Sequence, residues 1–100
     1  MIRRLKVTDA AQDDLLEIWS FIIAQENLEA ADTLLAAFAD QFDRLLRFPE
    51  IGRDRSEIKI HLRSVPVKDY IIFYQLTNRY IEIVRVLHGA RDIRRILAEA

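Results

Sequence analysis

The segment Tyr70–Leu87 constrains the fold most, because it contains two long runs of strand-forming residues. The runs are Tyr70–Leu76 and Tyr80–Leu87, both rich in Tyr, Ile, Phe and Val, and Thr77-Asn78-Arg79 separates them. These side chains favour strands, and asparagine is common in tight turns. The first run is apolar at both alternating positions, unlike a strand with one solvated face. The pattern predicts an antiparallel hairpin whose first strand is the most buried of its sheet.

A strand and a helix are predicted at the N-terminus. Ile2–Val7 alternates enough to indicate a short strand, and Thr8 can accept a hydrogen bond from the first free amides of a helix. Apolar side chains then recur at helical spacing from Ala11 onward. They are Leu15, Ile18, Trp19 and Ile22. The carboxylates Asp13, Asp14 and Glu17 are expected to lie off this stripe and face solvent.

A second helix is predicted to follow Asn27, which can cap it. Its apolar stripe continues for four turns through Ala31, Leu34, Leu35, Phe38, Phe42, Leu45 and Leu46. Phe48 should end the helix, because the residue before a proline is pushed out of the helical region. Two helices joined by a few residues form an antiparallel hairpin, and its apolar stripes need a sheet to cover them.

The C-terminal half predicts further strands. After a loop at Pro49–Ser56, Ile58–Arg63 alternates strictly and indicates a strand with one buried face. Val65–Asp69 should turn into the central strand. Residues Ile93, Ile96 and Leu97 have helical spacing among arginines and predict a short basic helix. The fold is predicted to be one α+β domain over residues 1–100, β-α-α-β-β-β with a short C-terminal helix, its antiparallel sheet packed against the helical hairpin.

Composition narrows the class of protein. The chain has 100 residues and no cysteine, which removes disulfides, thiol nucleophiles and thiolate metal sites. No apolar run approaches the roughly 20 residues of a membrane span. We therefore expect a soluble cytoplasmic protein with no membrane partner. The net charge of −1 combines −5 in residues 1–50 with +4 in residues 51–100. This asymmetry indicates either a partner that touches one face or two charged surfaces that only maintain solubility.

No catalytic motif is present in the sequence. There is no phosphate loop and no glycine-rich dinucleotide turn, and His61 and His88 are the only histidines, so neither a metal nor a cofactor is expected. The basic residues of the C-terminal half could bind phosphate or carboxylate groups, or they could pair within the chain. These basic residues are Lys59, Arg63, Arg85, Arg91, Arg94 and Arg95.

Four segments resemble one family over nearly the whole chain. They are VTDAAQDDLLEIWSFI, LLRFPEIGR, HLRSVPVKDYIIFYQL and IEIVRVLHGARDIRRIL. They resemble the ParE side of the RelE/ParE superfamily of type II toxins. The resemblance implies a cytoplasmic toxin encoded beside an antitoxin that neutralises it. ParE-type members poison DNA gyrase and are not known as hydrolases, whereas RelE-type members cut messenger RNA on the ribosome.

Two departures from the RelE pattern favour the ParE reading. RelE-type proteins commonly have an arginine after the tyrosine of the central strand, where this chain has Ile71, and the tail Ile93–Ala100 contains no Tyr or His. The resemblance therefore implies a gyrase inhibitor without enzymatic activity. Two alternatives stay open: a ribosome-dependent endoribonuclease, with Arg63, His88 and Arg91 as its catalytic residues, or a toxin-fold binding protein that is not toxic.

The same comparison assigns two binding surfaces. By resemblance, the target-binding surface contains His88, Arg91, Ile93, Arg94 and Arg95. Apolar residues outside the helical stripe leave a groove for a helix of a ParD-like antitoxin, and acidic residues of its tail would pair with nearby arginines. The residues of this antitoxin surface are Leu16, Phe21, Ile23, Arg63, Arg85 and Arg91. Toxin and antitoxin are expected to form a hetero-oligomer.

Overall fold

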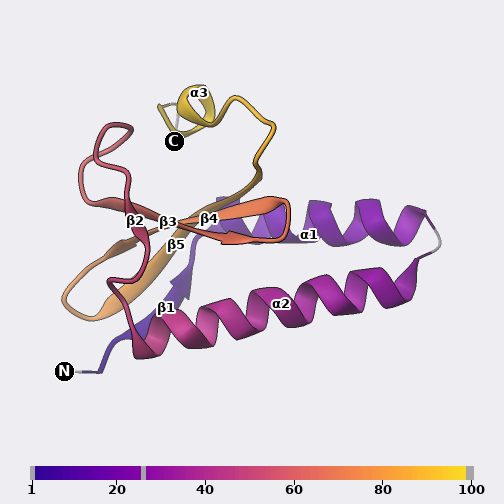
Figure 1. Cartoon of the computed structure of the whole chain (residues 1–100), viewed down its shortest axis with the longest axis horizontal. Coiled ribbons are helices and arrows are strands. Elements are labelled where there is room, and N and C mark those ends of the chain that lie inside the picture. The colour runs from indigo at the N-terminus through magenta and orange to yellow at the C-terminus, as the bar shows by residue number, and fades with distance from the viewer. Residues whose placement is uncertain (1, 26, 99–100) are drawn as a thin grey trace.

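A computed structural model describes residues 2–25 and 27–98 as one sheet covered by helices (Figure 1). Along the chain the elements are β1 (Arg4–Val7), α1 (Asp9–Ala24), α2 (Leu28–Arg47), β2 (Arg53–Asp54), β3 (Leu62–Val67), β4 (Tyr70–Leu76), β5 (Tyr80–His88) and α3 (Ile93–Ala98). The strand order is β1-β5-β4-β3-β2, so β4 is central. The predicted α+β architecture is confirmed. The sheet is mixed, however, because β1 pairs with β5 in parallel.

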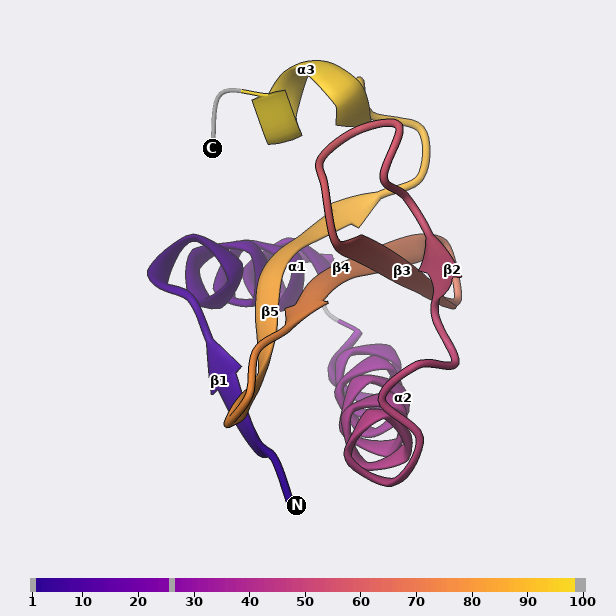
Figure 2. The same cartoon turned by 90° about the vertical axis from the view of Figure 1, so that its left-hand side faces the viewer.

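The predicted helix boundaries are confirmed by their caps. The Thr8 hydroxyl accepts a hydrogen bond from the Ala11 amide at 3.1 Å, and the Asn27 side chain accepts one from the Ala30 amide at 3.1 Å. Both helices lie on one face of the sheet (Figures 1 and 2). Their buried side chains form the first core with the sheet: Ala11, Leu34, Phe38, Leu45, Ile72, Tyr74, Ile81, Ile83 and Val86.

A second core covers the opposite face of the sheet. Figure 2 shows α3 on the side of the sheet away from α1 and α2. The buried residues of this core are Leu62, Phe73, Leu87 and Leu97, with Ile58, Ile71, Val84, Ile93 and Ile96 packed around them. Strand β4 is therefore covered on both faces, and Ile72, Phe73 and Tyr74 are each 0% exposed. No residue of β4 is exposed, in line with its uninterrupted apolar sequence, but the prediction that it is the most buried strand is wrong by share of buried residues, which is four of six in β3 and three of seven in β4.

The strand predicted at Ile58–Arg63 is wrong for most of its length. The segment turns instead: the Arg55 carbonyl accepts hydrogen bonds from the amides of Ile58 and Lys59, and His61 has a positive φ of 65°. Strand β3 begins only at Leu62. Ile60, expected on a buried face, is 71% exposed. The alternating sequence forms consecutive turns here, and these turns place Ile58 against the second core.

A bulge in β5 changes the direction in which its backbone groups point. Phe73 pairs with Arg85, but the next residue of β4, Tyr74, pairs with Ile83, so Val84 is an extra residue. The Ile83 carbonyl accepts a hydrogen bond from the Thr8 amide, and the Val84 carbonyl accepts one from the Thr8 hydroxyl. Adjacent carbonyls can both point away from β4 only where the alternation of the strand is interrupted. Beyond the bulge, the backbone amides and carbonyls of the even-numbered residues of β5 point away from β4, toward the outer edge of the strand.

Replacement of Phe38 by alanine should destabilise the protein by about 3–5 kcal/mol, because the ring is 2% exposed and leaves a cavity in the first core. Leu35→Ala is the matched control on the same helix, since Leu35 is 41% exposed. Urea unfolding of both variants measures the difference. Equal free energies of unfolding for the two variants would refute this assignment of the core.

Candidate functional site

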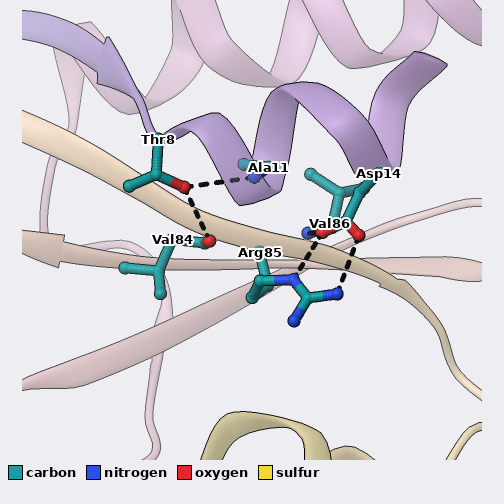
Figure 3. Close-up of polar contacts among 6 residues, drawn as sticks. All are labelled: Thr8, Ala11, Asp14, Val84, Arg85 and Val86. Carbon is teal, nitrogen blue, oxygen red and sulfur yellow. Dashed lines mark hydrogen bonds and ion pairs between the residues drawn. The ribbon is translucent and has the colours of Figure 1, made fainter. Parts of the chain in front are cut away.

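Side chains of α1 take the place of a strand along part of the β5 edge (Figure 3). Strand β1 ends at Val7, and beyond it the Thr8 hydroxyl donates to the Val84 carbonyl at 2.9 Å. Six residues later, an Asp14 carboxylate oxygen accepts from the Val86 amide at 2.9 Å. Two polar groups of the strand edge are thereby paired with side chains. This arrangement fixes α1 against β5.

The Asp14 carboxylate also binds Arg85. The guanidinium donates from Nε at 2.7 Å and from Nη2 at 2.8 Å, one bond to each carboxylate oxygen (Figure 3). These hydrogen bonds raise the pKa of Arg85 above its ordinary value. Arg85 was predicted to contact the antitoxin, and the structure shows its side chain, 19% exposed, bound within the chain. Its charge neutralises a carboxylate that would otherwise be buried alone.

The prediction that Asp14 faces solvent is wrong, since the residue is 7% exposed. Asp14 lies three residues after Ala11 and four before Ile18, so helical spacing places it on the buried stripe. A carboxylate at such a position needs a positively charged partner. That spacing was the signal in the sequence that could have revealed the ion pair.

Replacing Asp14 by alanine should cost about 3 kcal/mol, because it leaves Arg85 unpaired and removes the acceptor of the Val86 amide. Asp13→Ala, one residue earlier at an exposed position, should change the stability by less than about 0.5 kcal/mol. Chemical denaturation of both variants tests this difference. A stable Asp14→Ala protein would show that the ion pair does not hold α1.

Arg63 and Tyr74 together hold the loop that follows α2. Nη1 of Arg63 donates to the carbonyls of Glu50 and Gly52, at 3.1 and 2.9 Å. The Tyr74 hydroxyl donates to the Pro49 carbonyl at 2.8 Å and accepts from the Gly52 amide at 2.9 Å. Burial raises the pKa of this phenol, so the hydroxyl keeps its proton over a wider range of pH. The FPEIGR segment is thus shaped by two neighbouring strands.

Gly52→Ala should destabilise the protein by about 1–3 kcal/mol, because the added Cβ would overlap the buried Tyr74 side chain at its hydroxyl end. Gly89→Ala is the control: its Cβ would approach nothing closer than 3.4 Å, and Gly89 has no positive φ. Thermal unfolding compares the two. If both variants melt together, the contact between Gly52 and Tyr74 is not needed for stability.

Three residues predicted to contact partners meet at one pocket between α1 and the end of β5. They are Phe21, His88 and Arg91, and the pocket volume is about 220 Å³. Asp14, Glu17, Ile18, Tyr70 and Val86 complete its lining. The His88 ring packs edge-on against the Tyr70 ring, with the two ring centroids 5.3 Å apart. Its Nδ1 accepts a hydrogen bond from the Ala90 amide. The pocket thus combines aromatic rings with an exposed guanidinium.

The remaining predicted residues lie elsewhere. Ile93 is half-buried against the second core, whereas Arg94 and Arg95 are exposed on α3. On α1, Leu16 and Phe21 are 63% and 62% exposed. They are five positions apart in the sequence, which places them about 140° apart around the helix. Ile23 is half-buried and shares the side of Leu16, so the predicted antitoxin surface divides into two faces of α1.

The proposed nuclease residues are not gathered in one place. Arg63 pairs in the sheet with Tyr74, and His88 pairs with Tyr70. Four residues along β4 correspond to about 13 Å, and β3 and β5 lie on opposite sides of that strand. Arg63 is also occupied by the loop carbonyls. It therefore lies too far from His88 and Arg91 to act on the same phosphate.

Two further features of the described ranges 2–25 and 27–98 bear on the site. Within them, no group of three or more His, Asp or Glu side chains is arranged to hold a metal ion. None of the helices in these ranges has the length and apolar composition needed to cross a bilayer.

Comparison with known structures identifies the fold. The chain superposes on a solved structure of the chromosomal ParDE TA system from P. aeruginosa with a TM-score of 0.74 and 19% sequence identity. The match covers 87% of this chain and 96% of that one. The sheet with a helical hairpin on one face is therefore a fold that this chain shares with that structure.

Sequence comparison identifies the family. Residues 5–93 match the family described as ParE toxin of type II toxin-antitoxin system, parDE. The chain is 33% identical to Toxin ParE1 of Mycobacterium tuberculosis over 98 residues, covering 97% of this chain and 100% of that protein. It is 29% identical to Toxin ParE3 of Caulobacter vibrioides, over 86% of both chains. The chain belongs to the ParE toxin family, which confirms the resemblance seen in the sequence.

Proposed function

We propose that this toxin acts in the cytoplasm by inhibiting DNA gyrase, and that a ParD-like antitoxin neutralises it in a hetero-oligomer. The distance between Arg63 and the pair His88 and Arg91 is the observation that favours gyrase inhibition over RNA cleavage. Cleavage of RNA requires an acid, a base and charge stabilisation around one phosphate. The sheet keeps these candidate groups apart, whereas inhibition by binding needs only an accessible surface.

The target surface in this proposal lies at the end of β5 and on α3. Arg91, Arg94 and Arg95 are exposed there, and His88 is exposed beside them. Interfaces of this kind take most of their binding energy from a few anchored side chains, among which arginine is common. Ile93 packs against the second core and thereby holds the start of α3, and with it the exposed arginines, in place.

The antitoxin surface in this proposal lies on the helical hairpin. Exposed leucines occur on both helices, Leu16 on α1 and Leu28, Leu35 and Leu46 on α2. The three on α2 are separated by seven and eleven residues, so they share one side of the helix. An amphipathic helix of the antitoxin could cover such residues.

Expression without the antitoxin should arrest growth and accumulate DNA cleaved by gyrase, with messenger RNA intact. Arg91→Glu should reduce this toxicity at least about tenfold, because it reverses an exposed charge of the target surface. Arg79→Glu is the matched control, since Arg79 is exposed in the turn at the other end of β5. Deleting α3 would be a poorer test, because it uncovers the second core.

Cuts in ribosome-bound messenger RNA that disappear with His88→Ala would refute gyrase inhibition. Arrest that persists unchanged in the Arg91→Glu variant would refute the location of the target surface.

Leu16→Glu should weaken antitoxin binding at least about tenfold, or about 1.4 kcal/mol, because it places a charge in an apolar contact. The stability of the Leu16→Glu toxin should change little, since Leu16 is 63% exposed. Ala10→Glu, also exposed but about 120° around α1 from Leu16, is the control. Calorimetric titration with the antitoxin measures both. Equal affinities would exclude this side of α1 from the interface.

A further inference from the structure

The exposed charges of opposite sign lie on opposite sides of the sheet. Helices α1 and α2 have seven exposed carboxylates and two exposed arginines. Helix α3, on the other side (Figure 2), has two exposed arginines and no acidic residue. The asymmetry of charge along the sequence is therefore an asymmetry between two faces of the molecule, and the face that α3 partly covers is the one suited to an anionic partner.

Arg4 and Lys6 of β1 extend this basic side across the sheet. Leu5 and Val7 pack against the first core, so alternation along the strand places Arg4 and Lys6 on the opposite face, the one that α3 covers elsewhere. Tyr80 pairs in register with Arg4 and therefore shares that face. Both cations are exposed, and Tyr80 is 38% exposed. This end of the face is thus open to solvent.

The two cations keep their charge for an external partner. Neither Arg4 nor Lys6 forms an ion pair in the part of the chain that the structure describes. The Glu82 carboxylate, which is paired in register with Lys6, accepts instead from the side-chain amide of Gln75 at 2.9 Å. The Lys6 ammonium lies 5.7 Å from the centre of the Tyr80 ring. An aromatic ring at this distance holds the lysine in place without neutralising it.

The arrangement of these side chains fits a phosphate backbone. Residues two apart on one face of a strand are about 6.8 Å apart, and the phosphates of one DNA strand follow each other at about 3.4 Å along the helix axis. Arg4 and Lys6 can therefore bind different phosphates of the same strand. A tyrosine hydroxyl is also a common donor to phosphate oxygens, so Tyr80 adds a polar contact between them.

The proposed function supplies a physical reason for a contact with DNA. A toxin that makes gyrase accumulate cleaved DNA must bind the complex of enzyme and cleaved DNA more tightly than the other states of the enzyme. A toxin that touches the enzyme and the DNA together has this preference, because the phosphates are in place only when DNA is bound.

We infer that the side of the sheet away from the helical hairpin contacts the backbone of the DNA held by gyrase. Arg4 and Lys6 bind phosphates, Tyr80 supports them, and α3 contacts the enzyme. The inference rests on the proposed inhibition of gyrase and extends the target surface from α3 to β1. An acidic surface of gyrase is the other partner that this charge would fit, and crosslinking distinguishes the two.

The salt dependence of DNA binding measures the phosphate contacts directly. The full chain is titrated with a short fluorescent DNA duplex at increasing salt. Arg4→Gln/Lys6→Gln should reduce the slope of log affinity against log salt by about two, since each phosphate contact contributes about 0.9. Arg44→Gln/Arg47→Gln removes the same charge from exposed positions of α2 and should leave the slope unchanged. Equal slopes for the two double variants, or no binding by the parent at low salt, would overturn the inference.

Crosslinking in the complete complex identifies what Tyr80 faces. With p-benzoylphenylalanine in place of Tyr80, ultraviolet light should join the toxin to labelled DNA on gyrase. The same group in place of Leu28, which is 60% exposed on α2, is the control and should not reach DNA. Crosslinks from position 80 to a gyrase subunit alone, or to neither component, would overturn the inference and leave the proposed inhibition of gyrase intact.

The yield of cleaved DNA shows whether the contact contributes to toxicity. Arg4→Gln/Lys6→Gln should require at least about tenfold more toxin than the parent for the same cleavage by gyrase, with unchanged affinity for gyrase without DNA. Arg4→Lys/Lys6→Arg keeps both charges and should act as the parent does. A loss of affinity for gyrase alone would assign these cations to the enzyme and overturn the contact with DNA. No cleavage with the parent toxin would refute the proposed function itself, and the salt slopes would still decide whether this face binds DNA.

Discussion

The carboxylate of Asp14 is the interaction on which the arrangement of α1 depends. It joins α1 to β5 by accepting a hydrogen bond from the amide of Val86, 72 residues later in the chain. Its charge is neutralised by Arg85, the residue just before Val86. Burying an unpaired charge is costly, so the pair forms only when both elements are in place. The bulge at Val84 makes this possible, since it turns the Val86 amide toward α1. Helix position and strand register are therefore determined together.

The two cores leave the edge strands and element ends as the accessible parts of the sheet. Both faces of β4 are covered, one by the helical hairpin and the other by α3 with the turns around Ile58. A partner cannot reach the faces of β4 without displacing a helix. It can reach the end of β5, where a pocket lies between α1 and His88 and Arg91. This geometry favours recognition by peptide segments and protein surfaces.

The sequence predicted the elements with strong local signals. The caps at Thr8 and Asn27 and the apolar run of β4 each act through neighbouring residues, and all three are confirmed. Ile58–Arg63 misled because alternation alone cannot distinguish a strand from successive turns. The parallel pairing of β1 and the bulge depend on contacts between distant segments. No local pattern could indicate them.

The site was predicted only in part, for the same reason. Phe21, His88 and Arg91 are predicted from separate segments of the sequence, and the fold brings them to one pocket. The charges of Arg63 and Arg85 suggest contacts with a partner, but in the structure Arg63 binds a loop and Arg85 binds Asp14. A basic residue in a sequence is equally suited to internal and external partners, and burial decides between them.

The pairing of β1 with β5 sets the order in which the chain can fold during synthesis. Strand β1 leaves the ribosome before the other described elements, yet its partner residues begin at Tyr80. Until β5 has emerged, α1 and α2 have no complete sheet to cover, and their apolar faces stay open to other proteins. Contacts over such separations also slow folding. The finished binding surface therefore arises only after β5 has been synthesised, when a protein already present nearby can meet it as it forms.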